Sequence, residues 1–263
     1  MGTSEDKGNG RFFYSKGVEV NFGGLKALNN VSVAVGENEI RGLIGPNGAG
    51  KSTFFNVATG YIKASSGSVF FEGEDISSLK PHEIAQKGII RTFQKRGILP
   101  GLTVLENVLI GYHRLLPEMK LWHIALRLKR FKALEKEAIV EALDVIESVG
   151  LGDVSDHLAR DLSFGQQTLL EIGRALISRP RLLMLDEPAA GLSSSEREQV
   201  SQLLKGLAES HGVSLLISDH VMDFVMDVCE NLSVLNFGEI LAEGPADYIR
   251  QHPRVLEAYI GTG

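Results

Sequence analysis

Residues 45–53 carry the clearest chemistry in this sequence. They read Gly-Pro-Asn-Gly-Ala-Gly-Lys-Ser-Thr and fit the pattern G-x-x-x-x-G-K-[ST] at every fixed position. Such a loop turns backbone N–H groups inward, and the helix that follows adds the positive end of its dipole. Lys51 then supplies a full charge for the outer phosphates, and the Ser52 hydroxyl can bind Mg²⁺. The predicted nucleotide-binding positions of this segment are Gly45, Asn47, Gly48, Gly50, Lys51, Ser52 and Thr53.

Two adjacent carboxylates, Asp186 and Glu187, follow the apolar run 181–185. A continuous apolar run is typical of a central parallel strand, whose C-terminal end faces the same edge as a phosphate loop. Because side chains alternate along a strand, the two carboxylates point differently. One of them can therefore hold Mg²⁺ through water while the other polarises the attacking water. A solvated surface pair is the alternative, which the apolar run disfavours.

Two further polar side chains end predicted apolar strands. Gln94 closes the strand predicted over residues 88–94, and its amide can bind a metal's water or orient an attacking water without ionising. His220 follows the strand predicted over residues 213–218 and can donate to a γ-phosphate oxygen. A lone glutamine is usually solvated and a lone histidine usually structural. The place of His220 at the same sheet edge as Lys51 favours a role in catalysis, and the separation of Gln94 from Lys51 by 43 residues raises the interest of that glutamine.

Phe22 and the segment 162–167 are weaker signals. Phe22 ends an alternating strand, so its ring either stacks on a nucleotide base or closes the core, and the strand pattern leaves both open. The segment Leu-Ser-Phe-Gly-Gln-Gln precedes an amphipathic helix with Ser163 as its N-cap. Such a cap aims backbone donors and a dipole outward, although a simple capped helix gives the same pattern.

Alternating and apolar stretches predict the elements that hold these residues. Strands are expected over 18–22, 31–35, 39–44, 68–74, 88–94, 181–186, 213–218, 232–235 and 239–244, and helices over 54–59, 78–86 and 104–110, in a longer stretch after Pro117 whose apolar positions fall within 139–149, after Ser163, after a capping box at 195–198, and in the tail from Pro245. The first two strands should be antiparallel around a turn at Gly23-Gly24. Strands that alternate with helices predict an α/β fold.

Composition narrows the class of protein. The chain has 263 residues, of which 43% are hydrophobic and 23% charged, as expected for a soluble globular protein. A net charge of −6 gives no general reason to expect nucleic acid as a partner. Cys229 is the single cysteine, which excludes a disulfide within the chain and fits a reducing, intracellular setting. The sequence shows no long apolar run and no signal-peptide core, so any membrane role should come through partners.

Taken in order, these motifs resemble the nucleotide-binding subunit of ABC transporters over about residues 12–260. Residues 45–52 resemble Walker A, 91–94 the Q-loop and 162–166 the ABC signature. Asp186 and Glu187 resemble the Walker B aspartate and the catalytic glutamate, and His220 the switch histidine. The resemblance implies a mixed-sheet P-loop core with an antiparallel β subdomain over 11–95 and 163–244, a helical subdomain over 96–162 and a helical tail over 245–263.

The resemblance also implies cofactors and partners. ATP and Mg²⁺ would bind between the phosphate loop of one subunit and Ser163, Gly165 and Gln166 of a second ATP-binding subunit, either a copy or a paralogue. Ser52 and Gln94 would hold Mg²⁺ with Asp186, and Glu187, His220, Lys51 and Gln94 would serve catalysis. Transmembrane permease subunits would hold the chain at the cytoplasmic face of the membrane, and a periplasmic or extracellular binding protein would act indirectly.

A narrower resemblance is to the ATP-binding proteins of branched-chain amino-acid importers. It rests on residues 22–28, 91–94, 187–192 and 258–261 and on the helical insertion before the signature. Urea or amide importers and lipopolysaccharide export remain alternatives, and a P-loop small-molecule kinase is the non-transport alternative. Two positions depart from the pattern: Phe164 replaces the usual glycine, and Ser193-Ser194-Ser195 replace the usual Asp or Asn of the D-loop.

Overall fold

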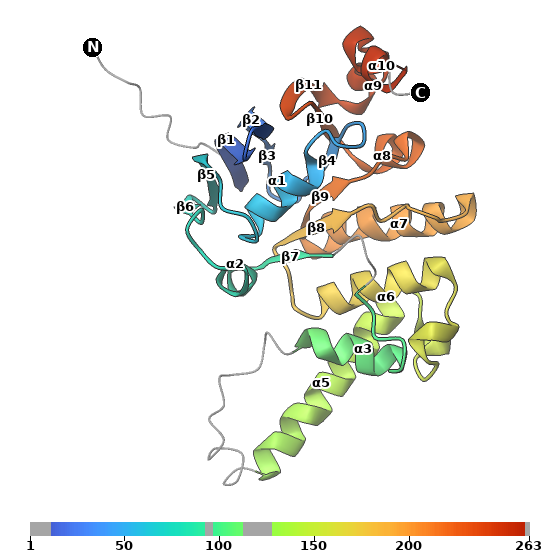
Figure 1. The fold of residues 1–263 in the computed structure, drawn as a ribbon. Coiled ribbons are helices and arrows are strands. Elements are labelled where there is room, and N and C mark those ends of the chain that lie inside the picture. The colour runs from blue at the N-terminus through green and yellow to red at the C-terminus, as the bar shows by residue number, and fades with distance from the viewer. Residues whose placement is uncertain (1–11, 93–96, 113–127, 261–263) are drawn as a thin grey trace.

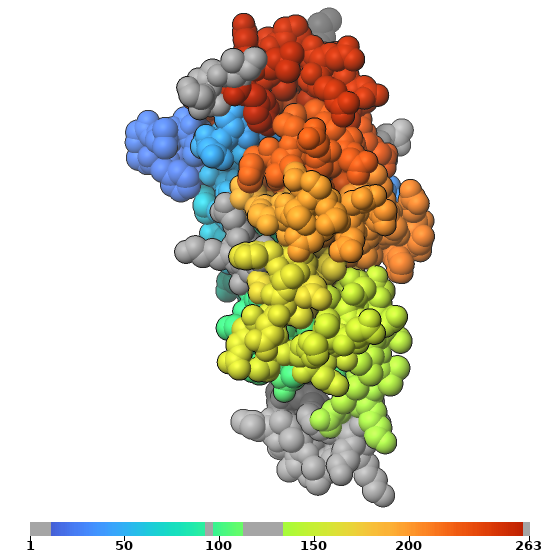
Figure 2. All heavy atoms as spheres, turned by 90° about the vertical axis from the view of Figure 1, so that its right-hand side faces the viewer, coloured from blue at the N-terminus to red at the C-terminus, as the bar shows by residue number. Residues whose placement is uncertain are grey.

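The computed structural model describes residues 12–92, 97–112 and 128–260. Within them, two sheets and a set of helices form an elongated molecule (Figures 1 and 2). Figure 2 shows the C-terminal segment at one end and the helices near residues 128–176 toward the other. Gln94 lies outside the described residues.

The larger sheet has the strand order β11-β10-β4-β9-β8-β7. Neighbours from β10 to β7 are parallel, and β11 joins β10 as an antiparallel hairpin. Its strands are β4 (Ile40–Ile44), β7 (Ile89–Arg91), β8 (Leu182–Asp186), β9 (Ser214–Ser218), β10 (Asn231–Asn236) and β11 (Glu239–Pro245). Every residue of β8 and β9 is buried, as a parallel strand covered on both faces requires. The C-terminal ends of β4, β8 and β9 therefore share one edge.

The smaller sheet is antiparallel, in the order β2-β1-β5-β6 with β3 paired to β1. Its strands are β1 (Phe13–Phe22), β2 (Leu25–Val31), β3 (Ala34–Val35), β5 (Ser66–Phe71) and β6 (Glu74–Asp75). The predicted turn between the first two strands is confirmed, because Phe22 pairs with Leu25 across it. The prediction of one strand over 31–35 was wrong. The ladder breaks after Val31, where the Val33 N–H donates to the side-chain Oγ of Ser15 at 2.9 Å.

Helices surround the larger sheet and form a separate layer beside it. Figure 1 shows α3, α5 and α6 gathered below the sheet, and α9 and α10 beside β11 at the opposite end. The helices are α1 (Lys51–Ala58), α2 (Pro81–Lys87), α3 (Val104–Gly111), α5 (Leu128–Ser148), α6 (Phe164–Leu176), α7 (Ser194–His211), α8 (Met222–Val228), α9 (Ala246–Gln251) and α10 (Pro253–Ile260), with 3-10 turns η2 (Gly152–Val154) and η3 (Ala159–Asp161). None of the helices in these ranges is long and apolar enough to cross a membrane.

Helix caps test the predicted helix starts. Ser163 caps α6, as predicted, and Thr103 caps α3, each with a capping box. The predicted box at 195–198 was wrong, because α7 begins two residues earlier. Its cap is Ser193, whose N–H donates to Glu196 Oε2 at 2.9 Å.

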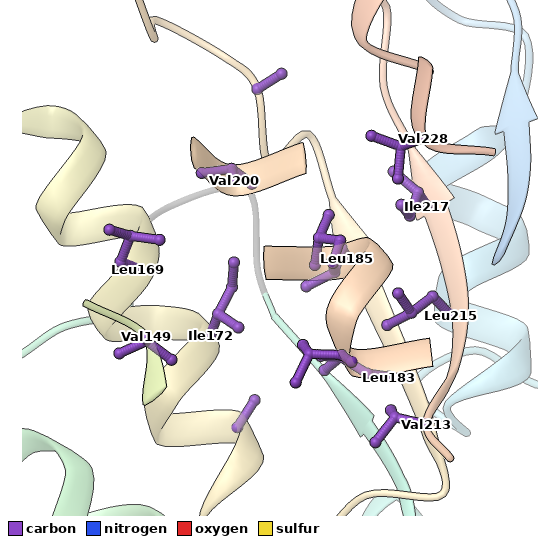
Figure 3. Packing of buried hydrophobic residues seen from close by; sticks show 14 of the residues in the cluster. Val149, Leu169, Ile172, Leu183, Leu185, Val200, Val213, Leu215, Ile217 and Val228 are labelled. Atoms are coloured by element: carbon purple, nitrogen blue, oxygen red, sulfur yellow. The ribbon is translucent and has the colours of Figure 1, made fainter. Parts of the chain in front are cut away.

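The hydrophobic core joins the helical layer to the sheet. Figure 3 shows Val149 and Ile172 on the helical side facing Leu183 and Leu185 of β8. All four belong to one buried cluster, whereas the smaller sheet packs with α1 in a second cluster. Helix α6 packs against both α3 and α7, so it bridges the two layers. The division of the chain into subdomains stays a proposal.

Candidate functional site

Residues 45–50 form a loop between β4 and α1 that only a glycine-rich sequence can make. Gly45 has φ 153°, and a Cβ there would lie 2.0 Å from the Leu235 carbonyl oxygen. Gly50, the N-cap of α1, has φ 109°, and a Cβ there would lie 2.8 Å from the Ala27 carbonyl oxygen. At Gly48, with φ 78°, a Cβ would meet nothing within 4 Å, so the loop opens to solvent there. The loop therefore presents backbone, not side chains, to an incoming ligand.

Lys51 lies at the first position of α1 and points back over this loop. Its Nζ donates to the Gly45 carbonyl at 2.5 Å and to the Pro46 carbonyl at 3.0 Å. Burial lowers the pKa of Lys51, and the carboxylates of Glu187, Asp186 and Asp219 oppose that shift. The two carbonyls thus satisfy an ammonium group that a phosphate would satisfy better.

The other predicted positions of this loop are accessible. Asn47, Gly48 and Ser52 are exposed, and Thr53 is half-buried. Phe22 is 49% exposed at the end of β1, so the alternative that its ring closes the core is wrong. Stacking of Phe22 on a base stays a prediction.

Asp186 ends β8 with its side chain almost fully buried. The Arg91 guanidinium on β7 donates from Nη2 to Asp186 Oδ2 at 2.9 Å, with both side chains under a tenth exposed. Burial raises the pKa of Asp186, and the hydrogen bond and charge of Arg91 lower it. A buried charge without such a partner would be costly, so the ion pair explains how the carboxylate is held.

Glu187 follows immediately and leaves the strand. Its φ is 55°, a left-handed conformation that is strained for a residue with a Cβ, and its N–H donates to the Ser218 carbonyl at 2.6 Å. Backbone strain of this kind persists where the surroundings fix it and is common at functional sites. The turn directs Glu187 away from Asp186 and toward β9.

Asp219 and His220 follow β9 directly. His220 Nδ1 lies 3.8 Å from Glu187 Oε1, and the imidazole is half-exposed. Asp219 is fully buried and accepts three backbone hydrogen bonds, from Ala189 at 2.8 Å, His220 at 2.7 Å and Val221 at 2.9 Å. One buried carboxylate therefore fixes the loop after Glu187 to the loop that carries His220.

The segment at Ser163 lies at the start of α6 in the helical layer. Ser163 Oγ donates to Glu196 Oε1 at 3.2 Å, and the Gly165 N–H donates to the same oxygen at 3.0 Å. The Ser163 N–H in turn donates to Gln166 Oε1, which completes the cap. These donors, with those of Ser193, hold the pKa of Glu196 at about 2. The segment thus binds a carboxylate of its own chain. Phe164 is 64% exposed beside it.

A cavity of about 320 Å³ separates this segment from the end of β8. Its lining comes from α6, from the end of β8 with the loop after it, and from the residue after β7, and it includes Thr92, Phe164, Thr168, Glu171, Asp186 and Glu187. In Figure 1, α6 lies below β7 and β8, whereas α1 lies beside the sheet at the level of β4 and β9. The structure therefore brings together Lys51, Asp186, Glu187 and His220, and sets Ser163, Gly165 and Gln166 apart from them.

Three polar residues of the site carried no predicted role of their own: Arg91, Asp219 and Glu196. Arg91 had a signal, because an arginine in an apolar strand requires a buried partner. Asp219 and Glu196 act through partners that are distant in the sequence, 30 and 31 residues away at Ala189 and Gly165. The pattern around them gave no sign of those contacts.

Comparison with known proteins identifies the class. The family model described as "ABC transporter" matches residues 28–190. The chain belongs to the ABC transporter family and is an ABC-type ATPase, the ATP-binding subunit of a transporter.

Particular relatives narrow the similarity. The chain is 40% identical over 245 residues to the high-affinity branched-chain amino acid transport ATP-binding protein BraF of Pseudomonas aeruginosa, covering 93% of this chain and 96% of BraF. It is 38% identical over 245 residues to LivG of Escherichia coli, a protein with the same description, at the same coverage of both chains.

Solved structures agree with the fold. An ATP-binding cassette of an ABC transporter in its ADP conformation superposes with a TM-score of 0.84 at 36% identity, covering 95% of this chain and 99% of that one. A dimeric cassette in a post-hydrolysis state bound to ADP and Pi superposes with a TM-score of 0.74 at 27% identity, covering 89% of this chain and 98% of that one. Cassettes of this family therefore bind nucleotide, and the α/β P-loop fold predicted from the sequence is confirmed.

Proposed function

We propose that this chain hydrolyses ATP to power the uptake of branched-chain or related amino acids through a membrane transporter. The convergence of Lys51, Asp186, Glu187 and His220 at one edge of a parallel sheet carries the ATPase part of the proposal. The transported substrate is inferred from BraF and LivG, branched-chain amino acid transport ATP-binding proteins that this chain resembles along nearly its whole length.

The residues of the site divide the work of phosphoryl transfer. Lys51 binds the outer phosphates with the backbone N–H groups of residues 45–50, and Phe22 stacks on the adenine. Glu187 orients and polarises the attacking water, while His220, close to it, donates to the γ-phosphate. Gln94 joins them as a sensor of the γ-phosphate.

Oxygen donors of the described residues suit Mg²⁺. No group of three His, Cys, Asp or Glu side chains that could hold a metal occurs in the described ranges. Mg²⁺ needs no such cage, since it takes one or two protein ligands beside nucleotide phosphates and water. The exposed Ser52 hydroxyl and the Asp186 carboxylate supply hard oxygen ligands of that kind, with Gln94 as a third. Bound there, the ion would neutralise charge on the phosphates.

The second wall of the nucleotide site is proposed to come from another ATP-binding subunit, a copy of this chain or a paralogue. Ser163, Gly165 and Gln166 present hydroxyl and backbone donors at the start of α6, and Glu196 now occupies the first two. An anionic phosphate from the facing subunit would take those donors, because a helix N-terminus favours negative charge. ATP binding would then close the dimer, and hydrolysis would reopen it.

Permease subunits are the proposed membrane partners. They would hold the chain at the cytoplasmic face, and a substrate-binding protein outside the membrane would deliver the amino acid. The D-loop position departs from the family pattern, and its Ser193 serves as the N-cap of α7. We expect this cap to keep the loop in place without the usual Asp or Asn.

Co-purification tests the proposal. The full chain, expressed with its neighbouring permease and binding-protein subunits, is isolated from detergent-solubilised membranes, and ATP turnover is measured in vesicles with and without leucine, urea or lipopolysaccharide. The proposal predicts a stable complex whose turnover rises with leucine. If urea or lipopolysaccharide stimulates turnover and leucine does not, the proposed substrate is wrong. If the chain transfers phosphate to a small molecule instead, the proposed transport function is wrong.

A further inference from the structure

Arg91 occupies an unusual position for an arginine. It is the last residue of the short strand β7, and its side chain is only 6% exposed. Arginine is almost never buried to this extent unless every charge finds a partner. The role of Arg91 can therefore be inferred from its contacts.

The guanidinium makes two kinds of contact in two directions. Toward β8, Nη2 donates to Asp186 Oδ2 at 2.9 Å. Toward α1, Nη1 donates to Asn56 Oδ1 at 2.7 Å and to Thr59 Oγ1 at 3.4 Å, and the group lies 5.3 Å from the Phe55 ring centroid. One planar side chain thus joins the strand that carries Asp186 to the helix that follows the phosphate loop. Its fork of donors suits such a double contact better than a lysine.

The contacts on α1 fall on the face that carries Ser52. Residues three, four and seven positions along a helix from a given residue share its face. Phe55, Asn56 and Thr59 stand in that relation to Ser52. The face that meets Arg91 is therefore the face that presents the Ser52 hydroxyl, one turn closer to the phosphate loop.

Resting on the proposed function, which assigns Ser52 and Asp186 to Mg²⁺, we propose that Arg91 is the positioning residue of the metal site. Its ion pair with Asp186 and its hydrogen bond to Asn56 set the separation of β8 and α1. The ion pair also fixes one oxygen of the Asp186 carboxylate. Arg91 does not bind the metal or the nucleotide. Partners that orient metal ligands in this way typically account for about 10–100-fold in metal affinity.

The test measures nucleotide affinity with and without metal. For each variant, the Kd of ADP is determined by titration calorimetry in MgCl₂ and again in EDTA, and the ratio of the two gives the gain due to Mg²⁺. Arg91→Met should reduce this gain about 10–100-fold and leave the Kd in EDTA within about twofold. Arg160→Met, at an exposed arginine outside the site, is the matched control and should change neither value.

Two more variants separate positioning from charge balance. Asn56→Ala keeps the ion pair and removes the shorter of the two hydrogen bonds toward α1, leaving the 3.4 Å contact with Thr59. The proposal therefore predicts a several-fold loss of the Mg²⁺ gain in a folded protein. Arg91→Lys keeps the charge and loses the fork, so its gain should also fall, and it serves if Arg91→Met does not fold. In an Asp186→Asn background, Arg91→Met should cause no further loss of the gain.

The outcomes distinguish this inference from the function on which it rests. A wild-type chain that binds ADP equally in MgCl₂ and EDTA overturns the metal assignment and the inference together. If the wild type shows the gain in ADP affinity due to Mg²⁺, and both Asn56→Ala and Arg91→Lys keep it, the inference alone is overturned. Equal weakening of both Kd values in the variants assigns Arg91 to general folding and also overturns it.

Discussion

Asp219→Asn is the perturbation whose effect follows most directly from the geometry. The buried carboxylate accepts backbone N–H groups on both of its oxygens, from Ala189 on one and from His220 and Val221 on the other. Burial raises the pKa of Asp219, and these three hydrogen bonds lower it. The side chain thus connects the loop after Glu187 to the loop that carries His220.

An asparagine can keep only one of these two oxygens. With its oxygen toward His220 and Val221, its NH₂ group faces the Ala189 N–H, which loses a charge-assisted hydrogen bond and leaves donors unpaired. Such a loss costs about 1.5–3 kcal/mol, and the smaller desolvation of a neutral side chain offsets part of it. We expect the free energy of unfolding to fall by about 2 kcal/mol, which at about 2–4 °C per kcal/mol lowers Tm by about 4–8 °C.

The catalytic effect should be larger than the stability effect. Release of the Ala189 loop shifts Glu187 relative to His220, and misplacement by about 1 Å can cost on the order of 10²-fold in rate. The assays are urea unfolding followed by circular dichroism and ATP turnover of the dimer under saturating ATP, with exposed Asp156→Asn as the control. If Asp219→Asn matches the control in both assays, the buried carboxylate does not position the two loops and the reasoning fails.

Three further predictions concern the site, the pH dependence and the core. Glu187→Gln should lower ATP turnover by about 10²–10⁴-fold and accumulate an ATP-bound dimer in gel filtration, and unchanged turnover would remove Glu187 from its role. Hydrogen bonds hold the pKa of Glu196 at about 2 against an ordinary 4.5, so its contribution to stability is present above pH 4.5 and is lost as the pH falls toward 2. Between pH 4.5 and pH 2, the free energy of unfolding of Glu196→Gln should fall less steeply than that of the wild type. An equally steep fall in both proteins would contradict the low pKa of Glu196. Leu183→Ala, at a fully buried position of β8, should lower the free energy of unfolding by about 2–5 kcal/mol in urea titrations, whereas a loss below about 1 kcal/mol would mean that the cluster in Figure 3 collapses around the cavity.

Much of the fold was predictable because local chemistry agrees with the tertiary structure. The apolar runs became the buried strands β8 and β9, and the hydroxyl of Ser163 capped α6 as expected. Errors arose where a tertiary contact overrode the local pattern. The Ser15 hydroxyl interrupts the strand predicted over 31–35, and Ser193 takes the cap of α7 from Ser195 in a run of three serines.

Helix α8 was not predicted at all. Its apolar residues Phe224, Val225 and Val228 do recur at helical spacing, but the helix is short and its N-cap side chain makes no hydrogen bond. A seven-residue helix of this kind owes its stability to packing on the sheet rather than to its own termini.

Some residues of the site were also predictable from the sequence, and others were not. Residues at the ends of apolar strands, such as Asp186, Glu187 and His220, were predictable because parallel strands bring their C-terminal ends to one edge. Arg91, Asp219 and Glu196 were not, because their partners lie on other elements and only the folded chain shows the pairing. Arg91 contacts Asp186, Asp219 connects the loops after Glu187 and at His220, and Glu196 accepts hydrogen bonds from the Ser163 segment.

The central claim is that a second subunit completes the nucleotide site of this chain. The direct measurement is ATP turnover of an equal mixture of two variants, Lys51→Ala and Ser163→Arg, against each variant alone. We expect each variant to be inactive and the mixture to recover turnover, because mixed dimers contain one intact pair of Lys51 and Ser163. A Ser163→Arg chain that alone hydrolyses ATP at the wild-type rate, with turnover per chain independent of protein concentration, would contradict it.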